Sequence, residues 1–286
     1  MDILKSKIDN SINYIYEYNK GLVESRFVQR HSDYIAIYLS SHNGCNKACR
    51  FCHLTHTKQT LFNEVTHDDY IAQAQLAFLG YDELNGDKKS KITKVHFNFM
   101  SRGEPLSNKC ITNPESLITL MSSLNKLCDV RGLLPRYNIS TIVPKNSEIK
   151  KNSFNIHPRE VNIYYSLYSL NEDFRRKWIP NAQDPNLVKE YLLRFWPNVR
   201  FHWAYIKGEN DSIEDTKKIA DYINNLDISE KKISIIQYNP PYEGHSVESH
   251  LDVITRNIEI LNEVAKVKMI QRVGFDVKAS CGMFVS

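Results

Sequence analysis

Apolar positions along the chain alternate between short β-type runs and longer helical stretches. Seven short runs, rich in β-branched and aromatic residues, predict strands. They are 34–40, 92–99, 137–141, 161–167, 199–206, 233–238 and 267–273. Helical periodicity between the runs predicts helices at 66–79, from 113 onward, at 185–195, at 211–225 and at 247–264. Thr66 and Asn113 are the expected N-caps, and Pro114 takes a first helical position.

This alternation predicts an α/β protein with a parallel sheet and right-handed crossovers. Six or seven βα units favour a partial (β/α)6 TIM-like barrel, and a doubly wound open sheet is the alternative. In a barrel, function lies on the loops after the carboxyl ends of the strands. The polar stretch 81–91 is expected to be a solvated loop.

The first 23 residues predict an amphipathic helix, because Ile8, Ile12 and Ile15 share one helical face and Gly21 follows. We therefore expect a helical extension at 1–30. The barrel, with a C-terminal strand and a cysteine-bearing tail, is expected at 31–286.

Composition narrows the class of protein. The chain has 286 residues, 42% of them hydrophobic and 11% aromatic, which excludes a disordered chain. No apolar run reaches the ~18 residues of a transmembrane helix, and no secretory signal is visible. The net charge of +4 permits an RNA partner without requiring one. Without a signal, the six cysteines indicate a reducing cytoplasm rather than a disulfide framework.

Three of the cysteines, Cys45, Cys49 and Cys52, are spaced C-x3-C-x2-C. A chance grouping of buried thiols is the plainest interpretation. A zinc site completed by His53 or His56 is the second, and it would suit a non-catalytic RNA-binding protein. The third is a [4Fe–4S] cluster on three thiolates, which leaves one iron open to bind S-adenosylmethionine (SAM).

The cysteine spacing, with Phe51 before the last cysteine and a strand before the first, resembles the motif of the radical-SAM superfamily. Gly103 and Glu104 follow the next predicted strand and resemble the superfamily loop that binds the amino group of SAM. Glycine allows close backbone approach, and a carboxylate suits an ammonium. The resemblance implies a radical-SAM partial barrel that holds a [4Fe–4S] cluster and SAM.

Seven segments in order narrow the resemblance to the RlmN/Cfr family of RNA adenine methyltransferases. They are 38–45 (YLSSHNGC), 102–108 (RGEPLSN), 139–141 (IST), 165–172 (YSLYSLNE), 205–211 (YIKGEND), 237–240 (QYNP) and 272–282 (RVGFDVKASCG). The family methylates C2 or C8 of adenine in RNA. The resemblance therefore implies such a reaction in tRNA or rRNA, with C2 favoured, through an S-methylcysteine intermediate and a 5′-deoxyadenosyl radical.

Residue roles follow from these matches. Cluster ligands would be Cys45, Cys49 and Cys52. SAM contacts would be Gly103, Glu104, Ser140, Ser166, Leu167, Tyr168 and Asn239, with Tyr168 in place of a family histidine. Cys281 matches the cysteine that carries the methyl group, and Glu24 matches a proton acceptor. The resemblance also implies an electron donor such as flavodoxin and a monomeric enzyme.

The chain departs from the family at two points. Tyr38 stands at the position of the family's second, adduct-resolving cysteine. The alternatives are release of the product by Cys110, by a small thiol or without any thiol, or an enzyme that stalls on its RNA. Only 44 residues precede Cys45, where the family has a small RNA-binding domain, so this is expected to be a short form. A different radical-SAM reaction on the same scaffold is therefore the alternative. The basic residues available for RNA are scattered: Arg26, Arg30, Arg102, Arg175, Arg176, Lys177, Lys207, Lys231 and Lys232.

Overall fold

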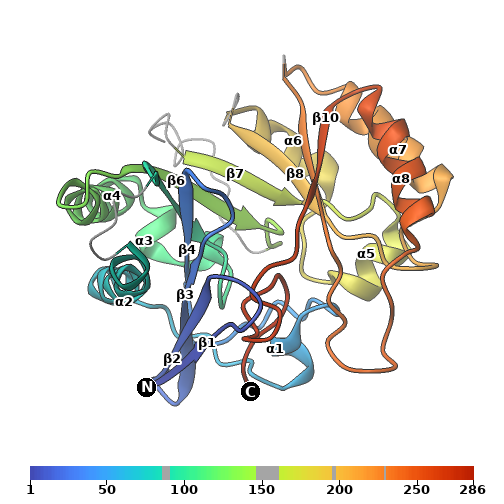
Figure 1. Cartoon of the computed structure of the whole chain (residues 1–286). Coiled ribbons are helices and arrows are strands. Elements are labelled where there is room, and N and C mark those ends of the chain that lie inside the picture. The colour runs from blue at the N-terminus through green and yellow to red at the C-terminus, as the bar shows by residue number, and fades with distance from the viewer. Residues whose placement is uncertain (86–90, 146–160, 195–197, 229) are drawn as a thin grey trace.

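The structure is a computed structural model that describes residues 1–85, 91–145, 161–194, 198–228 and 230–286. The described residues form one ten-stranded sheet whose spatial order follows the chain (Figure 1). The strands are β1 (Asp2–Lys5), β2 (Ser11–Tyr18), β3 (Gly21–Val28), β4 (Tyr34–Leu39), β5 (Lys94–Phe99), β6 (Leu134–Thr141), β7 (Val161–Ser166), β8 (Val199–Trp203), β9 (Lys232–Ile236) and β10 (Lys266–Ile270).

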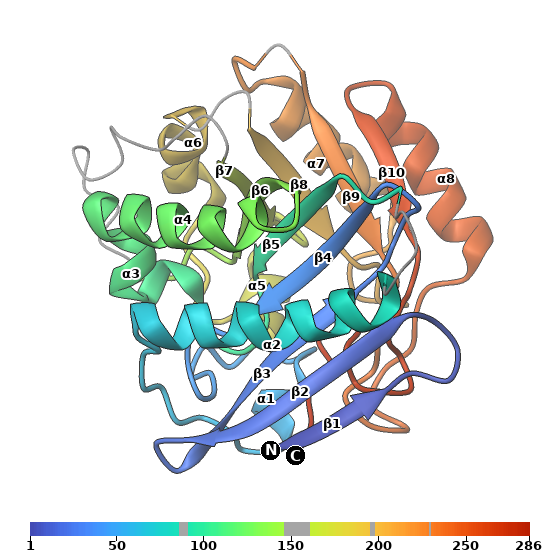
Figure 2. The ribbon, with the colours of Figure 1, turned by 60° about the vertical axis from the view of Figure 1, so that its left-hand side comes forward.

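Helices connect the parallel strands and cover the sheet. They are α1 (His53–His56), α2 (His67–Asn85), α3 (Lys109–Thr112), α4 (Pro114–Asp129), α5 (Glu172–Trp178), α6 (Pro185–Arg194), α7 (Ile213–Asn224) and α8 (Leu251–Asn262), with the 3-10 turn η1 (Pro105–Ser107) after β5. Helices α2 and α4 lie at one flank and α7 and α8 at the other (Figures 1 and 2). No helix of the described chain is long and apolar enough to cross a bilayer.

The parallel α/β core confirms the predicted fold class. Within the described residues, the strands from β4 to β10 pair in parallel, each with its neighbour in sequence. Each predicted run corresponds to one of them. The expected caps are also present: Asn113 accepts from the Ser116 amide at 3.0 Å, and Thr66 exchanges hydrogen bonds with Asp69. Helix α2 extends beyond the expected end, to Asn85, and 86–90 of the expected loop lie outside the described residues.

The predicted N-terminal helix is wrong. This segment forms strands β1, β2 and β3, which join the sheet through an antiparallel contact between β3 and β4. Asn19 and Lys20 both have positive φ and make the two-residue turn between paired Tyr18 and Gly21. Such a turn matches the twist of a hairpin, so cross-strand pairing outweighed the helical spacing of the isoleucines. The domain division near residue 30 stays a prediction.

The segment after β10 returns to the N-terminal strands, as Figure 1 shows. The Gly274 amide donates to Asp9 at 2.7 Å, and the Lys7 amide donates to Asp276 at 2.8 Å. Further along, Asn13 of β2 donates to the Val277 carbonyl at 3.1 Å. The tail that carries Cys281 is therefore seated against β2 and β3 by backbone and side-chain hydrogen bonds.

A buried glutamine fixes the end of β4, where the three-cysteine loop begins. The Gln73 side chain of α2 accepts from the Ser40 amide at 2.7 Å and donates to the Ser40 carbonyl at 3.1 Å. Both residues are fully buried, so these bonds satisfy backbone groups that water does not reach. Gln73 thus supplies the hydrogen bonds that a neighbouring strand would otherwise make at the end of β4.

Replacing this amide is expected to destabilise the fold. Gln73→Leu leaves the Ser40 amide and carbonyl without partners, which we expect to lower the free energy of unfolding by about 3 kcal/mol. Urea unfolding followed by circular dichroism measures this. Gln75→Leu, at an exposed position of the same helix, is the matched control and should change stability little. Equal midpoints for the two variants would contradict the assignment.

Candidate functional site

The loop directly after β4 carries the three cysteines. It is held close to the following segment, because the Cys45 amide donates to the Gln59 carbonyl at 3.0 Å. A Cβ on Gly44 would lie 2.5 Å from the Leu61 carbonyl oxygen and 2.6 Å from that of Gln59. Only glycine therefore fits before the first cysteine, and the packing against residues 59–61 leaves the loop little freedom.

The three thiols share an environment that disfavours charge. Burial, with the neighbouring thiols, raises the pKa of Cys45 to about 12 and that of Cys49 well above its usual value. Burial also raises the pKa of Cys52 to about 11. Thiolates at these positions therefore need a cationic group to stabilise them. No three His, Cys, Asp or Glu side chains of the described chain converge on a single metal ion. A cluster does not require such convergence, because each thiolate binds a different iron.

Glu104 is a buried carboxylate at the end of β5, beside these cysteines. It accepts hydrogen bonds from the Thr141 hydroxyl at 2.6 Å and from the amides of Leu106 and Ile142 at 3.1 and 3.3 Å. Burial raises its pKa to about 7 despite these bonds. Among the described residues it has no ion-pair partner. A buried carboxylate of this kind is a ready acceptor for an ammonium group.

Gly103 explains how that carboxylate is presented. Its φ is +96°, and a Cβ would lie 2.5 Å from both Ser41 Oγ and His42 Nδ1. Both neighbours are buried side chains that follow β4. The loop after β5 therefore packs directly against the start of the cysteine loop.

Ser140 and Ser166 lie at the ends of β6 and β7 and meet at one histidine. Each Oγ is 3.2 Å from His202 Nε2 of β8. Burial lowers the pKa of His202 to about 4, and Arg200 adds to this, so the ring is neutral. The structure thus brings the two predicted serines together. His202 is a site residue that the sequence motifs do not mark.

Tyr168, in place of the family histidine, has a φ of +57° and stacks on Phe51 of the cysteine motif with ring centroids 4.4 Å apart. Buried Asn210 donates to the Tyr168 carbonyl at 3.1 Å, and Arg175 donates to the Leu167 carbonyl at 3.0 Å. The loop after β7 is therefore fixed through its backbone and covers the aromatic position of the motif.

Cys281 lies between the cysteine loop and the loop after β9. Its carbonyl accepts from Asn239 Nδ2 at 2.8 Å, and the Gly282 carbonyl accepts from the His53 amide at 2.9 Å. Cys281 is exposed to solvent. The protein packed around it still raises the pKa of the thiol, while Arg26 and Arg30 oppose the increase. The structure therefore places the predicted methyl-carrying cysteine beside the predicted cluster loop.

Tyr38 and the Cys281 thiol both interact with Arg30, whereas Cys110 has other neighbours. The Tyr38 hydroxyl accepts from Arg30 Nε at 3.0 Å, and Arg30 also influences the Cys281 thiol. Cys110 lies in α3, and the charges that raise its pKa, after burial itself, are Glu64 and Asp69. Because the two thiols have different surroundings, the structure gives no support to Cys110 as the resolving thiol.

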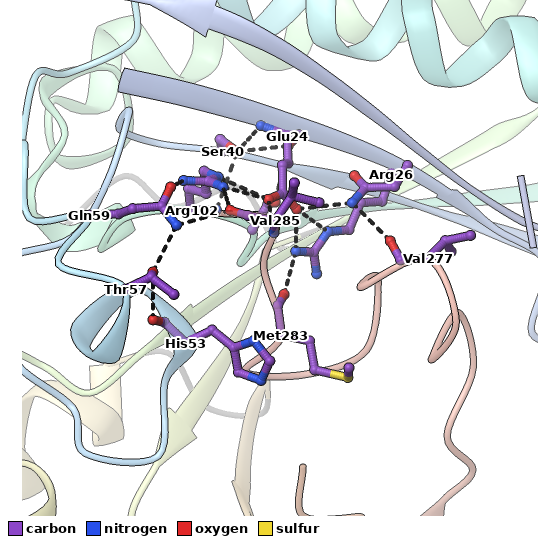
Figure 3. Close-up of polar contacts among 12 residues, drawn as sticks. Glu24, Arg26, Ser40, His53, Thr57, Gln59, Arg102, Val277, Met283 and Val285 are labelled. Carbon is purple, nitrogen blue, oxygen red and sulfur yellow. Dashed lines mark hydrogen bonds and ion pairs between the residues drawn. The ribbon is translucent and has the colours of Figure 1, made fainter. Parts of the chain in front are cut away.

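Glu24 is buried in a cluster of charges beneath the tail (Figure 3). It accepts from Arg26 at 2.6 Å, Arg102 at 2.7 Å, Asn13 at 3.1 Å and the Val285 amide at 2.8 Å. Burial opposes its ionisation, but the two arginines outweigh this and lower its pKa. A carboxylate so fully bonded and so acidic is poorly suited to the predicted role of proton acceptor.

Several arginines expected on the surface are instead buried. Arg26, Arg102 and Arg175 are 2%, 0% and 8% exposed, so they bind the protein itself and are wrong as candidate phosphate contacts. Their sequence signal is weak, because an arginine at a strand or loop position usually remains solvated. Arg102, directly before Gly103, is the one whose place in a motif could have suggested a role.

The residues fit the cluster and SAM that the resemblance implies. Three thiols on one packed loop supply soft ligands. Glu104 supplies a buried carboxylate that has no ion-pair partner within the part of the chain that the structure describes. Asn239 adds a buried Oδ1 that has no hydrogen-bond partner among the described residues. Unsatisfied acceptors of this kind are costly unless a ligand completes them.

Comparisons with known proteins agree with this site. No family model matches the chain. It is 27% identical over 290 residues to "Probable dual-specificity RNA methyltransferase RlmN" of Clostridium botulinum, strain Loch Maree, covering 98% of this chain and 77% of that protein. It is 27% identical over 265 residues to "Dual-specificity RNA methyltransferase RlmN" of Phenylobacterium zucineum, covering 88% of this chain and 63% of that protein.

A solved structure confirms the fold. A radical SAM methyltransferase from Sphaerobacter thermophilus superimposes with a TM-score of 0.78 at 20% identity, covering 99% of this chain and 80% of that one. The predicted resemblance is therefore confirmed: the chain is similar to proteins named as RlmN RNA methyltransferases over nearly its whole length, and its fold matches that of a solved radical SAM methyltransferase.

Proposed function

We propose that this chain is a radical-SAM enzyme that methylates an adenine carbon of RNA, with C2 favoured over C8. The observation that carries the proposal is the position of Cys281, whose backbone is bonded to Asn239 and whose neighbour Gly282 is bonded to His53 of the cysteine loop. The names of the relatives support RNA as the substrate, and we propose tRNA or rRNA as the class of RNA. The cysteine chemistry suits a reducing cytoplasm.

The cofactors would be held by residues that the fold already places. Cys45, Cys49 and Cys52 would bind a [4Fe–4S] cluster, and Glu104 would accept the ammonium of SAM. When bound, this pair supplies the one-electron chemistry that a weakly nucleophilic adenine carbon requires. SAM would be oriented and shielded from water by residues at the ends of neighbouring strands: Gly103, Ser140, Ser166, the backbone of Leu167 and Tyr168, and Asn239. An external reductant such as flavodoxin would supply electrons.

Cys281 would carry the methyl group. Its thiolate, formed by loss of the thiol proton to solvent, would attack the methyl carbon of one SAM. The new S–CH3 bond would form as the bond from that carbon to the sulfonium breaks and S-adenosylhomocysteine leaves. Arg26 and Arg30 favour the thiolate and so assist this step. A monomer would suffice for this, because all these residues come from one chain.

Tyr38 is the observation that favours a second candidate function. Its phenol holds the place of the family's second cysteine, so the same scaffold would release its product differently or act on another substrate. SAM cleavage without any methylated nucleoside would indicate this alternative.

Removing the Cys281 thiol is expected to abolish methylation. Cys281→Ala leaves nothing to carry the methyl group, so methyladenine should fall below detection in RNA from cells that express the variant. Mass spectrometry of digested nucleosides measures this, and the wild-type Cys281 peptide should show one added methyl group. Cys110→Ala is the matched control and should retain the product. Methyladenine at wild-type levels with Cys281→Ala would refute the assigned role.

Glu104 is expected to make SAM binding depend on pH. Its pKa of about 7 means that the carboxylate becomes ionised as the pH rises from 6 to 8, so affinity for the ammonium should increase over this range. Glu104→Gln should bind SAM about tenfold more weakly at pH 8 and without this dependence. Calorimetry on anaerobically reconstituted protein tests both. An unchanged pH profile in the variant would contradict the contact.

A further inference from the structure

We propose that Glu24, Arg26 and Arg102 form a buried latch that positions Cys281 by holding the backbone of residues 283–285. Glu24 is then a positioning residue rather than a proton acceptor. The inference rests on the proposed function only in taking Cys281 as the reacting thiol.

The three side chains bind the tail through its backbone. Glu24 Oε1 accepts from the Val285 amide at 2.8 Å, and Arg102 Nη2 donates to the Val285 carbonyl at 2.5 Å. Arg26 Nη2 donates to the Met283 carbonyl at 2.7 Å. Figure 3 shows these contacts converging on one short stretch of tail. Because backbone groups are held, the latch fixes the path of the chain rather than one side chain.

Phe284, between Met283 and Val285 in the sequence, packs its ring against both arginines of the latch. The guanidinium carbon of Arg26 lies 4.6 Å from the Phe284 ring centroid, and that of Arg102 lies 5.6 Å away. The ring is only 6% exposed. Two desolvated cation–π contacts therefore add to the hydrogen bonds that keep this segment seated.

The latch also joins the tail to the two cofactor loops. Arg102 directly precedes Gly103 and Glu104, and its Nη1 donates to Gln59 Oε1 at 2.5 Å. Gln59 in turn donates to the Val285 carbonyl at 2.9 Å and accepts from the Cys45 amide through its own carbonyl. A single hydrogen-bonded network thus sets the Cys281 tail relative to the expected cluster and SAM positions.

The charges explain why the carboxylate is required. Arg26 and Arg102 are buried, and Glu24 is the carboxylate that pairs with both. Without it two guanidinium groups would face each other unpaired, which is strongly unfavourable in a dry interior. Six donors from Arg26, Arg102, Asn13 and Val285 saturate the carboxylate oxygens. The carboxylate of Glu24 therefore has a structural role in holding these donors.

Val285→Pro tests the latch while leaving Glu24 and both arginines intact. Proline removes the amide that donates to Glu24, whereas the matched control Val285→Ala keeps both backbone hydrogen bonds. The readouts are hydrogen exchange of the 277–286 peptide and the alkylation rate of Cys281, resolved by peptide mass spectrometry in reduced, metal-free full-length protein. These readouts do not depend on methylation, so they remain decisive if the proposed function fails.

We expect about tenfold faster exchange and faster Cys281 alkylation in Val285→Pro than in Val285→Ala, with an unchanged thermal midpoint. In reconstituted enzyme, turnover should fall while the KM for SAM stays constant. Glu24→Gln should free the tail in the same way. Equal exchange and alkylation in the two Val285 variants would overturn the proposal. So would a Glu24→Gln protein that loses turnover while its tail stays protected, because that result restores a proton-transfer role.

Discussion

The burial of one carboxylate between two guanidinium groups is the interaction on which the site geometry depends. Glu24 is fully buried with Arg26 and Arg102, and the three charges satisfy one another and the tail backbone at once. Charges so deeply buried must be paired and fully hydrogen-bonded, so the arrangement tolerates little displacement. The tail that carries Cys281 is therefore an ordered part of the fold.

Some buried polar groups of the site have all their hydrogen bonds made within the protein, and others do not. This difference separates the residues that support the structure from those expected to bind a ligand. Glu24 is surrounded by donors, and its pKa is lowered. Glu104 has only neutral donors, and burial raises its pKa. Asn239 donates from its amide nitrogen to the Cys281 carbonyl, and its buried oxygen has no partner among the residues that the structure describes. A ligand would complete the groups that are left without partners.

The N-terminal strands explain how the tail is accommodated. They extend the parallel sheet with an antiparallel hairpin and carry Asn13, Glu24 and Arg26, each of which contacts the returning C-terminal segment. Residues from the two ends of the sequence thus make one surface behind the cysteine loop. Tyr38, which accepts a hydrogen bond from Arg30, has a phenol where the resemblance predicts a second cysteine.

The sequence by itself determined the parallel α/β core, the helix caps at Thr66 and Asn113, and the spacing of Cys45, Cys49 and Cys52, because these depend on local periodicity and short-range pattern. It also marked Glu104, Asn239 and Cys281 through their motifs. Only the tertiary structure decided that 1–28 forms strands, since hairpin pairing overrides an apparent helical period. It alone assigned Arg26, Arg102 and Glu24 to one buried cluster, because burial of a charge depends on partners far away in the chain.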